Sequence, residues 1–179
     1  KIKILDNPFK NYNFKKIIKD NFWNGSYFLD DLSGSKYVAG DANIFPFWSG
    51  VFDDEKMLKS SITAIQKEGL DKPFPLKYTQ NNIKKIKMIG SEIFVPGYER
   101  SSIWVHMGPL FIDLVKKINE NKAEEYIQQY RSIIEKYKNY LEVFDADGKP
   151  YKTPFYYSDE GMLWAAMFLE LLLKMDTIS

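Results

Sequence analysis

Cysteine is absent from the sequence, and histidine occurs once, as His106. The chain therefore has no disulfide, no thiolate nucleophile and no cysteine zinc site, and one imidazole cannot form a multi-histidine metal cluster. No run of eighteen apolar residues exists, so we expect no membrane-spanning helix. His106 lies in an apolar stretch, where a histidine packed in the core is more common than a catalytic one.

An excess of charge is also lacking. The sequence has 25 basic and 24 acidic residues, which gives a net charge of +1. A basic patch is the usual footprint of nucleic-acid and anionic-membrane binding, so we expect neither as a partner. The sequence calls for no cofactor or metal. Its first residues show no signal peptide, and we expect a cytoplasmic protein.

Length and composition fit one domain. The 179 residues suffice for a single core, and 16% of them are aromatic, about twice the usual share. A tyrosine-rich core explains the aromatic content well. The alternative is a cleft lined with aromatic faces, which suits carbohydrates, but composition by itself favours the core.

Hydrophobic periodicity predicts six helices. Three are amphipathic, near residues 9–24, 55–68 and 122–141, and three are apolar on almost all sides, near 42–52, 103–118 and 162–173. The residues expected to cap their N-termini are Asp6 or Asn7, Asp41, Asp53 or Asp54, Ser101 or Ser102, and Ser158 or Asp159.

The two kinds of helix alternate along the chain. Amphipathic helices expose one face to water, whereas helices that are apolar all round need neighbours on every side. We therefore expect an all-α fold of about six helices in three hairpins, with an inner and an outer row, equivalent to half of an (α/α)6 toroid. The long loops 25–41, 71–101 and 142–159 each precede a buried helix. They should gather at one end, where function is expected.

Three segments, in this order, resemble the six-hairpin glycoside hydrolases, most closely the trehalase and processing α-glucosidase group and more distantly the debranching-type glucosidases. The segments are FWNGSYFLDD, YERSSIWVHMGPL, and EVFDADGKPY followed by EGMLWAAMFLEL. The matching residues are Trp23, Gly25, Tyr27 and Asp30; Tyr98, Arg100 and Trp104; and Glu142, Phe144, Asp145, Gly148, Gly161 and Trp164.

The resemblance implies hydrolysis of an α-glucosidic bond with inversion, which uses a general acid and a general base. It places the base at Glu142, read as the end of the fifth helix. The order of residues 141–173, a carboxylate followed by an aromatic loop and an apolar helix, itself predicts a pocket walled by Tyr156, Tyr157 and Trp164 with this charged group at its mouth. The acid would precede residue 1. Residues 1–179 would then be a single domain forming the C-terminal half of a larger (α/α)6 catalytic domain, and carry half of an active site.

The expected contacts to the sugar are Trp23, Asp41, Tyr98, Arg100, Trp104, Tyr157 and Trp164. Several of them have a structural alternative. Asp41 also fits a helix cap, Arg100 an ion pair with Glu99 or Asp145, and the tryptophans on apolar helices fit core packing. Asp30 fits a turn residue that orders the first loop, and Glu142 a solvated residue near a helix end.

A non-catalytic carbohydrate-binding or protein-interaction helical module is the alternative function. A sugar epimerase on the same fold is disfavoured because such enzymes use paired histidines. Half a toroid exposes apolar flanks, so we expect the missing N-terminal half or self-association to cover them.

Overall fold

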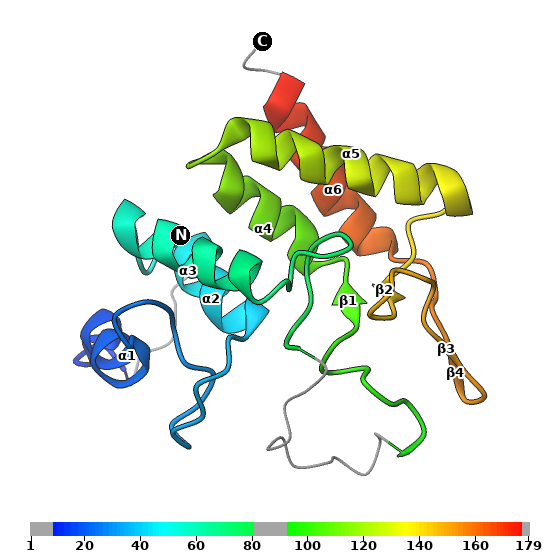
Figure 1. The fold of residues 1–179 in the computed structure, drawn as a ribbon. Coiled ribbons are helices and arrows are strands. Elements are labelled where there is room, and N and C mark those ends of the chain that lie inside the picture. Colours follow the sequence, from blue (N-terminus) through cyan, green and yellow to red (C-terminus); the bar gives the residue numbers. More distant parts are fainter. Residues whose placement is uncertain (1–8, 81–92, 177–179) are drawn as a thin grey trace.

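The computed structural model describes residues 9–80 and 93–176, and this part of the chain is mostly helical (Figure 1). Its helices are α1 (Phe14–Phe22), α2 (Gly40–Trp48), α3 (Glu55–Lys67), α4 (Met107–Lys116), α5 (Glu120–Tyr137) and α6 (Met162–Asp176). Two small antiparallel pairs accompany them: β1 (Ile103–Trp104) with β2 (Val143–Phe144), and β3 (Lys152–Thr153) with β4 (Tyr156–Tyr157).

Side-chain caps fix where several helices begin. The Asp54 carboxylate accepts hydrogen bonds from the backbone N–H groups of Lys56 and Met57, which confirms the expected start of α3. In contrast, α1 begins at Phe14, where Asn13 is the N-cap, and not near Phe9. The expected caps Asp6 and Asn7 lie outside the described residues.

The helix expected to begin after Ser101 or Ser102 begins only at Met107. The preceding Ile103 and Trp104 form β1, in register with Phe144 and Val143. Pro109 explains the shorter helix, because a proline ring clashes with the carbonyl four residues earlier in a continuous helix. The prediction that Trp104 lies on a helix is therefore wrong.

The helices pack in two rows. α2 contacts α4 and α4 contacts α6, while α3 lies on α2 and α5 lies on α4. Between the rows is the core, and its largest fully buried side chains include Tyr126, Tyr130, Phe74, Phe111 and Ile65. These contacts do not establish the expected three hairpins, and the toroid arrangement stays a prediction.

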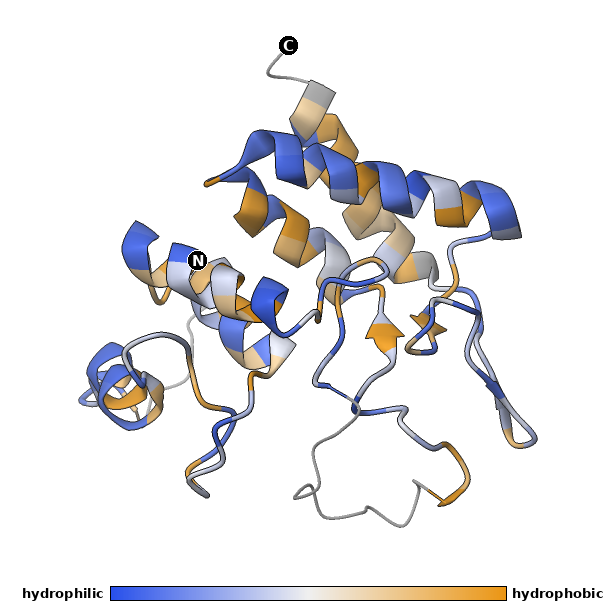
Figure 2. Cartoon of the chain, viewed as in Figure 1, coloured by the Kyte–Doolittle hydropathy of each residue, from blue (hydrophilic) through white to orange (hydrophobic). Residues whose placement is uncertain are grey.

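Burial distinguishes the three apolar helices. α4 is enclosed, and its ribbon is largely orange in Figure 2, whereas the visible side of α5 is largely blue. The expectation of complete burial is wrong for α2 and α6. Trp48 is 51% exposed, Leu163 is 76% exposed and Leu169 is 59% exposed. An apolar sequence therefore indicates a helix in each case, but it does not distinguish the enclosed α4 from α2 and α6, which each have an uncovered flank.

The loops that precede α2, α4 and α6 gather at the same end of the helices, as expected (Figure 1). At that end, Tyr98 of the second loop packs on Tyr156 of β4, with ring centroids 5.1 Å apart. Within the described residues, no helix combines the length and apolar character needed to cross a bilayer.

Candidate functional site

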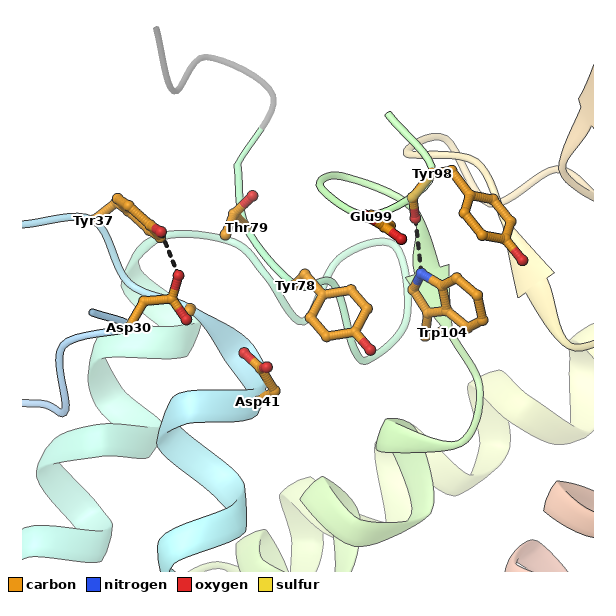
Figure 3. A pocket seen from close by; sticks show the side chains of 9 residues that line it. Asp30, Tyr37, Asp41, Tyr78, Thr79, Tyr98, Glu99 and Trp104 are labelled. Atoms are coloured by element: carbon orange, nitrogen blue, oxygen red, sulfur yellow. Dashed lines mark hydrogen bonds between the residues drawn. The ribbon is translucent and has the colours of Figure 1, made fainter. Parts of the chain in front are cut away.

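A pocket of about 400 Å³ opens among the loops at this end. Its volume lies in the range of ligand sites. Side chains from the first two long loops, the start of α2 and β1 surround it (Figure 3). The lining residues are Asp30, Tyr37, Ala39, Asp41, Tyr78, Thr79, Tyr98, Glu99 and Trp104.

Backbone hydrogen bonds hold the loop segment before residue 80 against its neighbours. The N–H of Trp104 donates to the carbonyl of Leu76 at 3.0 Å, and the N–H of Thr79 donates to that of Arg100 at 2.8 Å. On the other side, the N–H of Gly40 donates to the carbonyl of Tyr78 at 2.7 Å. The segment therefore fixes the distance between β1 and the start of α2, which are two walls of the pocket.

Gly40 makes the last of these contacts, its own hydrogen bond to Tyr78, possible. A Cβ atom at this position would overlap the carbonyl oxygen of Lys77 and lie 3.1 Å from the Leu76 side chain. Only a residue without a side chain allows α2 to approach the loop this closely. The close approach places Asp41, in the first turn of α2, at the pocket.

One wall of the pocket is aromatic. The indole N–H of Trp104 donates to the carbonyl oxygen of Tyr98 at 2.8 Å, and the two rings pack edge to face with centroids 4.7 Å apart. Tyr78 packs edge to face on Trp104 at 6.1 Å. Because its N–H is bonded to the backbone, Trp104 presents its ring, and not its polar group, to the pocket.

The opposite wall is acidic. The hydroxyl of Tyr37 donates to the carboxylate of Asp30 (Figure 3), and burial is the main cause that raises the pKa of Tyr37. The carboxylate of Asp41 accepts from the N–H of Ala42 at 2.8 Å. Burial raises the pKa of Asp41, and the charge of Asp30 raises it further. Asp41 therefore binds a proton more readily than an ordinary aspartate.

Glu142 lies five residues beyond the end of α5, directly before β2, and not at the helix end that the sequence indicated. Its N–H donates to the carbonyl of Asp159 at 2.9 Å, and its carbonyl accepts from Val105 at 3.2 Å. The side chain is half-buried. Burial raises the pKa of Glu142, and the charge of Asp159 adds to this effect.

Electrostatic coupling connects Glu142 with the aromatic wall. The pKa of Tyr98 is raised to about 12, first by burial and then by the charges of Glu142 and Glu99. Glu142 also directly precedes Val143, the register partner of Trp104. The candidate base thus adjoins the wall formed by Tyr98 and Trp104, although it is not itself a lining residue of the pocket.

The remaining predicted contacts do not line the pocket. Trp164 packs behind Trp104, at 6.2 Å between ring centroids, and on His106 at 4.9 Å. Arg100 contributes its backbone carbonyl to the loop pairing described above. Trp23 packs on Phe28 at 5.0 Å, and Tyr157 on β4 is 59% exposed. The structure therefore brings three of the seven predicted sugar contacts, Asp41, Tyr98 and Trp104, into the pocket lining.

His106 packs among aromatic rings, as expected of a core histidine. Burial lowers its pKa, so the imidazole is neutral at physiological pH. Among the described residues, no group of three histidine, cysteine or acidic side chains is arranged to hold a metal ion.

Sequence reasoning missed the lining residues Tyr37, Ala39, Tyr78, Thr79 and Glu99, and it matched Asp30 to the family segment but interpreted its role as that of a turn residue. Tyr78 and Thr79 reach the pocket because their backbones pair with Gly40 and Arg100, each more than twenty residues away in the sequence. No local sequence pattern reveals such pairing. The usable signal was Gly40, a glycine directly before an acidic residue at the start of an apolar helix.

Comparison with known proteins leaves the resemblance to glycoside hydrolases as a proposal. No protein-family model matches the chain, and no curated protein matches it either.

Proposed function

We propose that the chain belongs to an inverting glycoside hydrolase that cleaves an α-glucosidic linkage in an oligosaccharide or glucan. One observation carries the proposal. Glu142 is fixed by backbone hydrogen bonds on both sides, adjoins the wall of Tyr98 and Trp104, and has a pKa raised by burial. A carboxylate with a raised pKa beside an aromatic cleft is suited to general base catalysis on a sugar.

In this mechanism Glu142 removes a proton from a water molecule as that water attacks the anomeric carbon. A carboxylic acid on the other face of the sugar protonates the leaving oxygen. In inverting enzymes the two groups stand roughly 6.5–9.5 Å apart, which leaves room for the water. We assign the acid to a segment outside residues 1–179, in the other half of an (α/α)6 toroid.

The pocket provides the two kinds of contact that sugars use. The rings of Tyr78, Tyr98 and Trp104 offer apolar surface to the C–H faces of a pyranose. The carboxylates of Asp30 and Asp41 accept hydrogen bonds from sugar hydroxyls, and such bonds to charged groups are stronger than neutral ones.

The test is glucose release from trehalose, maltose, isomaltose and glycogen, measured with the natural full-length protein and its Glu142→Gln variant. Removing the base should lower kcat by about 10²–10⁴-fold while sugar binding persists. Proton NMR of the first product should show the β-anomer, as inversion of an α-linkage requires.

The matched control is Glu160→Gln, because Glu160 is an exposed glutamate near the same loop whose side chain accepts one hydrogen bond, from Asn139 at 3.2 Å. This variant should keep wild-type activity. Equal activity of wild type and the Glu142→Gln variant would remove Glu142 from the mechanism. Sugar binding by wild type without cleavage of any substrate would favour a carbohydrate-binding module.

A second candidate, an interaction module, is favoured by the open flank of α2, α4 and α6. A groove of about 380 Å³ lies there, lined by Trp48, Pro109, Leu110, Asp113, Leu163, Met167, Glu170, Leu171 and Lys174. Two of its apolar side chains, Trp48 and Leu163, are exposed, and large exposed apolar groups that gather in one place mark interaction sites. We propose that further helices of the same catalytic domain, or a second copy, cover it. Sedimentation velocity of residues 1–179 tests this, since a stable monomer would contradict it.

A further inference from the structure

The pocket has acidic groups on several sides. Its described lining residues include the carboxylates of Asp30, Asp41 and Glu99 and no lysine, arginine or histidine. This acidic charge contributes to the raised pKa values of the lining tyrosines Tyr37 and Tyr78. Burial raises the pKa of Tyr78, and the charges of Asp41 and Glu99 raise it further. The lining side chains therefore contribute acidic groups, and no basic ones, from the start of α2 to the second loop.

The carboxylates are spread around the pocket and do not meet at one point. Among the described residues, no group of three acidic, histidine or cysteine side chains could hold a metal ion. Tyr78 lies between Asp41 and Glu99 in Figure 3, and Trp104 lies beyond it. Aromatic faces attract cations as carboxylates do. This arrangement suits an extended organic cation better than a metal ion.

The pocket also contains a polar group without a partner. Thr79 is 5% exposed, and its hydroxyl makes no hydrogen bond within the part of the chain that the structure describes. Buried hydroxyls are almost always hydrogen-bonded in folded proteins, so an unsatisfied one that lines a pocket marks a contact left for a ligand. A ligand hydroxyl or ammonium group can satisfy it.

We propose that this pocket selects its ligand by charge and binds a hydroxylated ligand that carries a protonated amine, such as an amino sugar. It binds neutral sugars more weakly and rejects phosphorylated or carboxylated ones. The identification of the ligand as a sugar rests on the proposed function. The preference for a cation rests on the lining carboxylates and on the aromatic faces of Tyr78 and Trp104.

The test is calorimetric titration of residues 1–179 with four probes at about pH 6, where the amines are protonated. The probes are glucosamine, glucose, glucose 6-phosphate and cyclohexylamine. We expect glucosamine to bind about tenfold more tightly than glucose, and glucose 6-phosphate about tenfold more weakly than glucose. Added salt should reduce both differences in affinity, because it screens the charge of the lining carboxylates.

Two variants assign the effect to the pocket. Asp41→Asn and Glu99→Gln should each reduce the preference for glucosamine over glucose about threefold. Glu68→Gln, which removes an exposed carboxylate at the end of α3, should leave the preference unchanged. The ratio of two affinities within one protein is used because a general loss of stability would weaken both probes alike.

The outcomes separate this proposal from the enzymatic one. Equal affinities for glucosamine and glucose would overturn charge selection and leave the sugar site in place. Tight binding of cyclohexylamine without binding of any sugar would support the cation preference and contradict the glycosidase proposal. Equal effects of Glu68→Gln and Asp41→Asn, or no binding of any probe, would overturn charge selection, and the hydrolysis assay would decide the enzymatic proposal separately.

Discussion

Asn43 provides the most direct link between the fold and the pocket. Its side chain is fully buried in α2 and makes three hydrogen bonds. The amide oxygen accepts from the N–H of Phe28 at 2.8 Å, and the amide nitrogen donates to the carbonyls of Phe28 and Ala39 at 3.0 and 2.9 Å. Asn43 therefore attaches the loop that carries Asp30 to the helix that carries Asp41.

The Asn43→Ala substitution should destabilise the protein by about 2–4 kcal/mol. It leaves the N–H and carbonyl of buried Phe28 without partners, and each unsatisfied buried group costs roughly 1–3 kcal/mol. The better helix propensity of alanine recovers only about 0.5 kcal/mol. With a urea m-value of about 2 kcal/mol/M, the midpoint of unfolding should fall by roughly 1–2 M.

Urea unfolding followed by tryptophan fluorescence measures the midpoint, and amide hydrogen exchange at Phe28 reports the local effect. The matched control is Asn21→Ala in α1. The Asn21 amide also donates to a helix carbonyl, that of Ile17 at 2.8 Å, but it is exposed. It should change stability by less than about 0.5 kcal/mol. Equal shifts for the two variants would refute the argument from burial.

Three further variants test local features. Gly40→Ala should lower the stability of the protein by about 1–3 kcal/mol and weaken sugar binding, because its Cβ would overlap the carbonyl of Lys77. Thermal unfolding measures the loss of stability, and glucose titration measures the loss of binding. An unchanged midpoint of thermal unfolding would contradict the close approach of α2 to the loop. Burial raises the pKa of Asp41 above its ordinary value of 3.8. The neutral form of Asp41 therefore stabilises the folded protein fully below pH 3.8, and this stabilisation is lost as the pH rises through the raised pKa. Asp41→Asn should therefore be more stable than wild type at neutral pH, with a smaller difference in acid, and a wild type that is the more stable at neutral pH would contradict this. Asp54→Ala should lower the stability of the protein by about 1 kcal/mol, because it removes the N-cap of α3. Asp53→Ala removes an exposed ion pair and should lower the stability by less. Equal urea midpoints for the two variants would contradict the assignment of the cap.

Features that depend on neighbouring residues were predictable from the sequence. α3 begins at its expected cap, Asp54, and is followed by Gly69, whose φ of +69° ends the helix in the conformation that glycine favours. α5 buries Ala123, Tyr126, Ile127 and Tyr130, the spacing that an amphipathic helix requires. Short-range periodicity and capping chemistry determine these elements.

Features that depend on distant pairing were not predictable in the same way. Ile103 and Trp104 fit an apolar helix by pattern, yet they pair with residues forty positions later. Pro109 was a local signal against the longer helix. A motif predicts a role for the half-buried Glu142, whereas its position next to Asp159 and Tyr98 follows from that pairing.

The pocket and the exposed flank are carried by the same helices, which relates the two proposed properties. Asp41 lies in the first turn of α2, and Trp48 is its last residue, about 10 Å further along the axis at 1.5 Å per residue. The two sets of lining residues have no member in common. A domain or a second copy that covers the flank would therefore come close to the pocket without covering the residues that line it. This is the geometry required if the second carboxyl of the active site comes from outside the chain, because helices packed on α2 and α6 would bring their loops to the end where Glu142 lies.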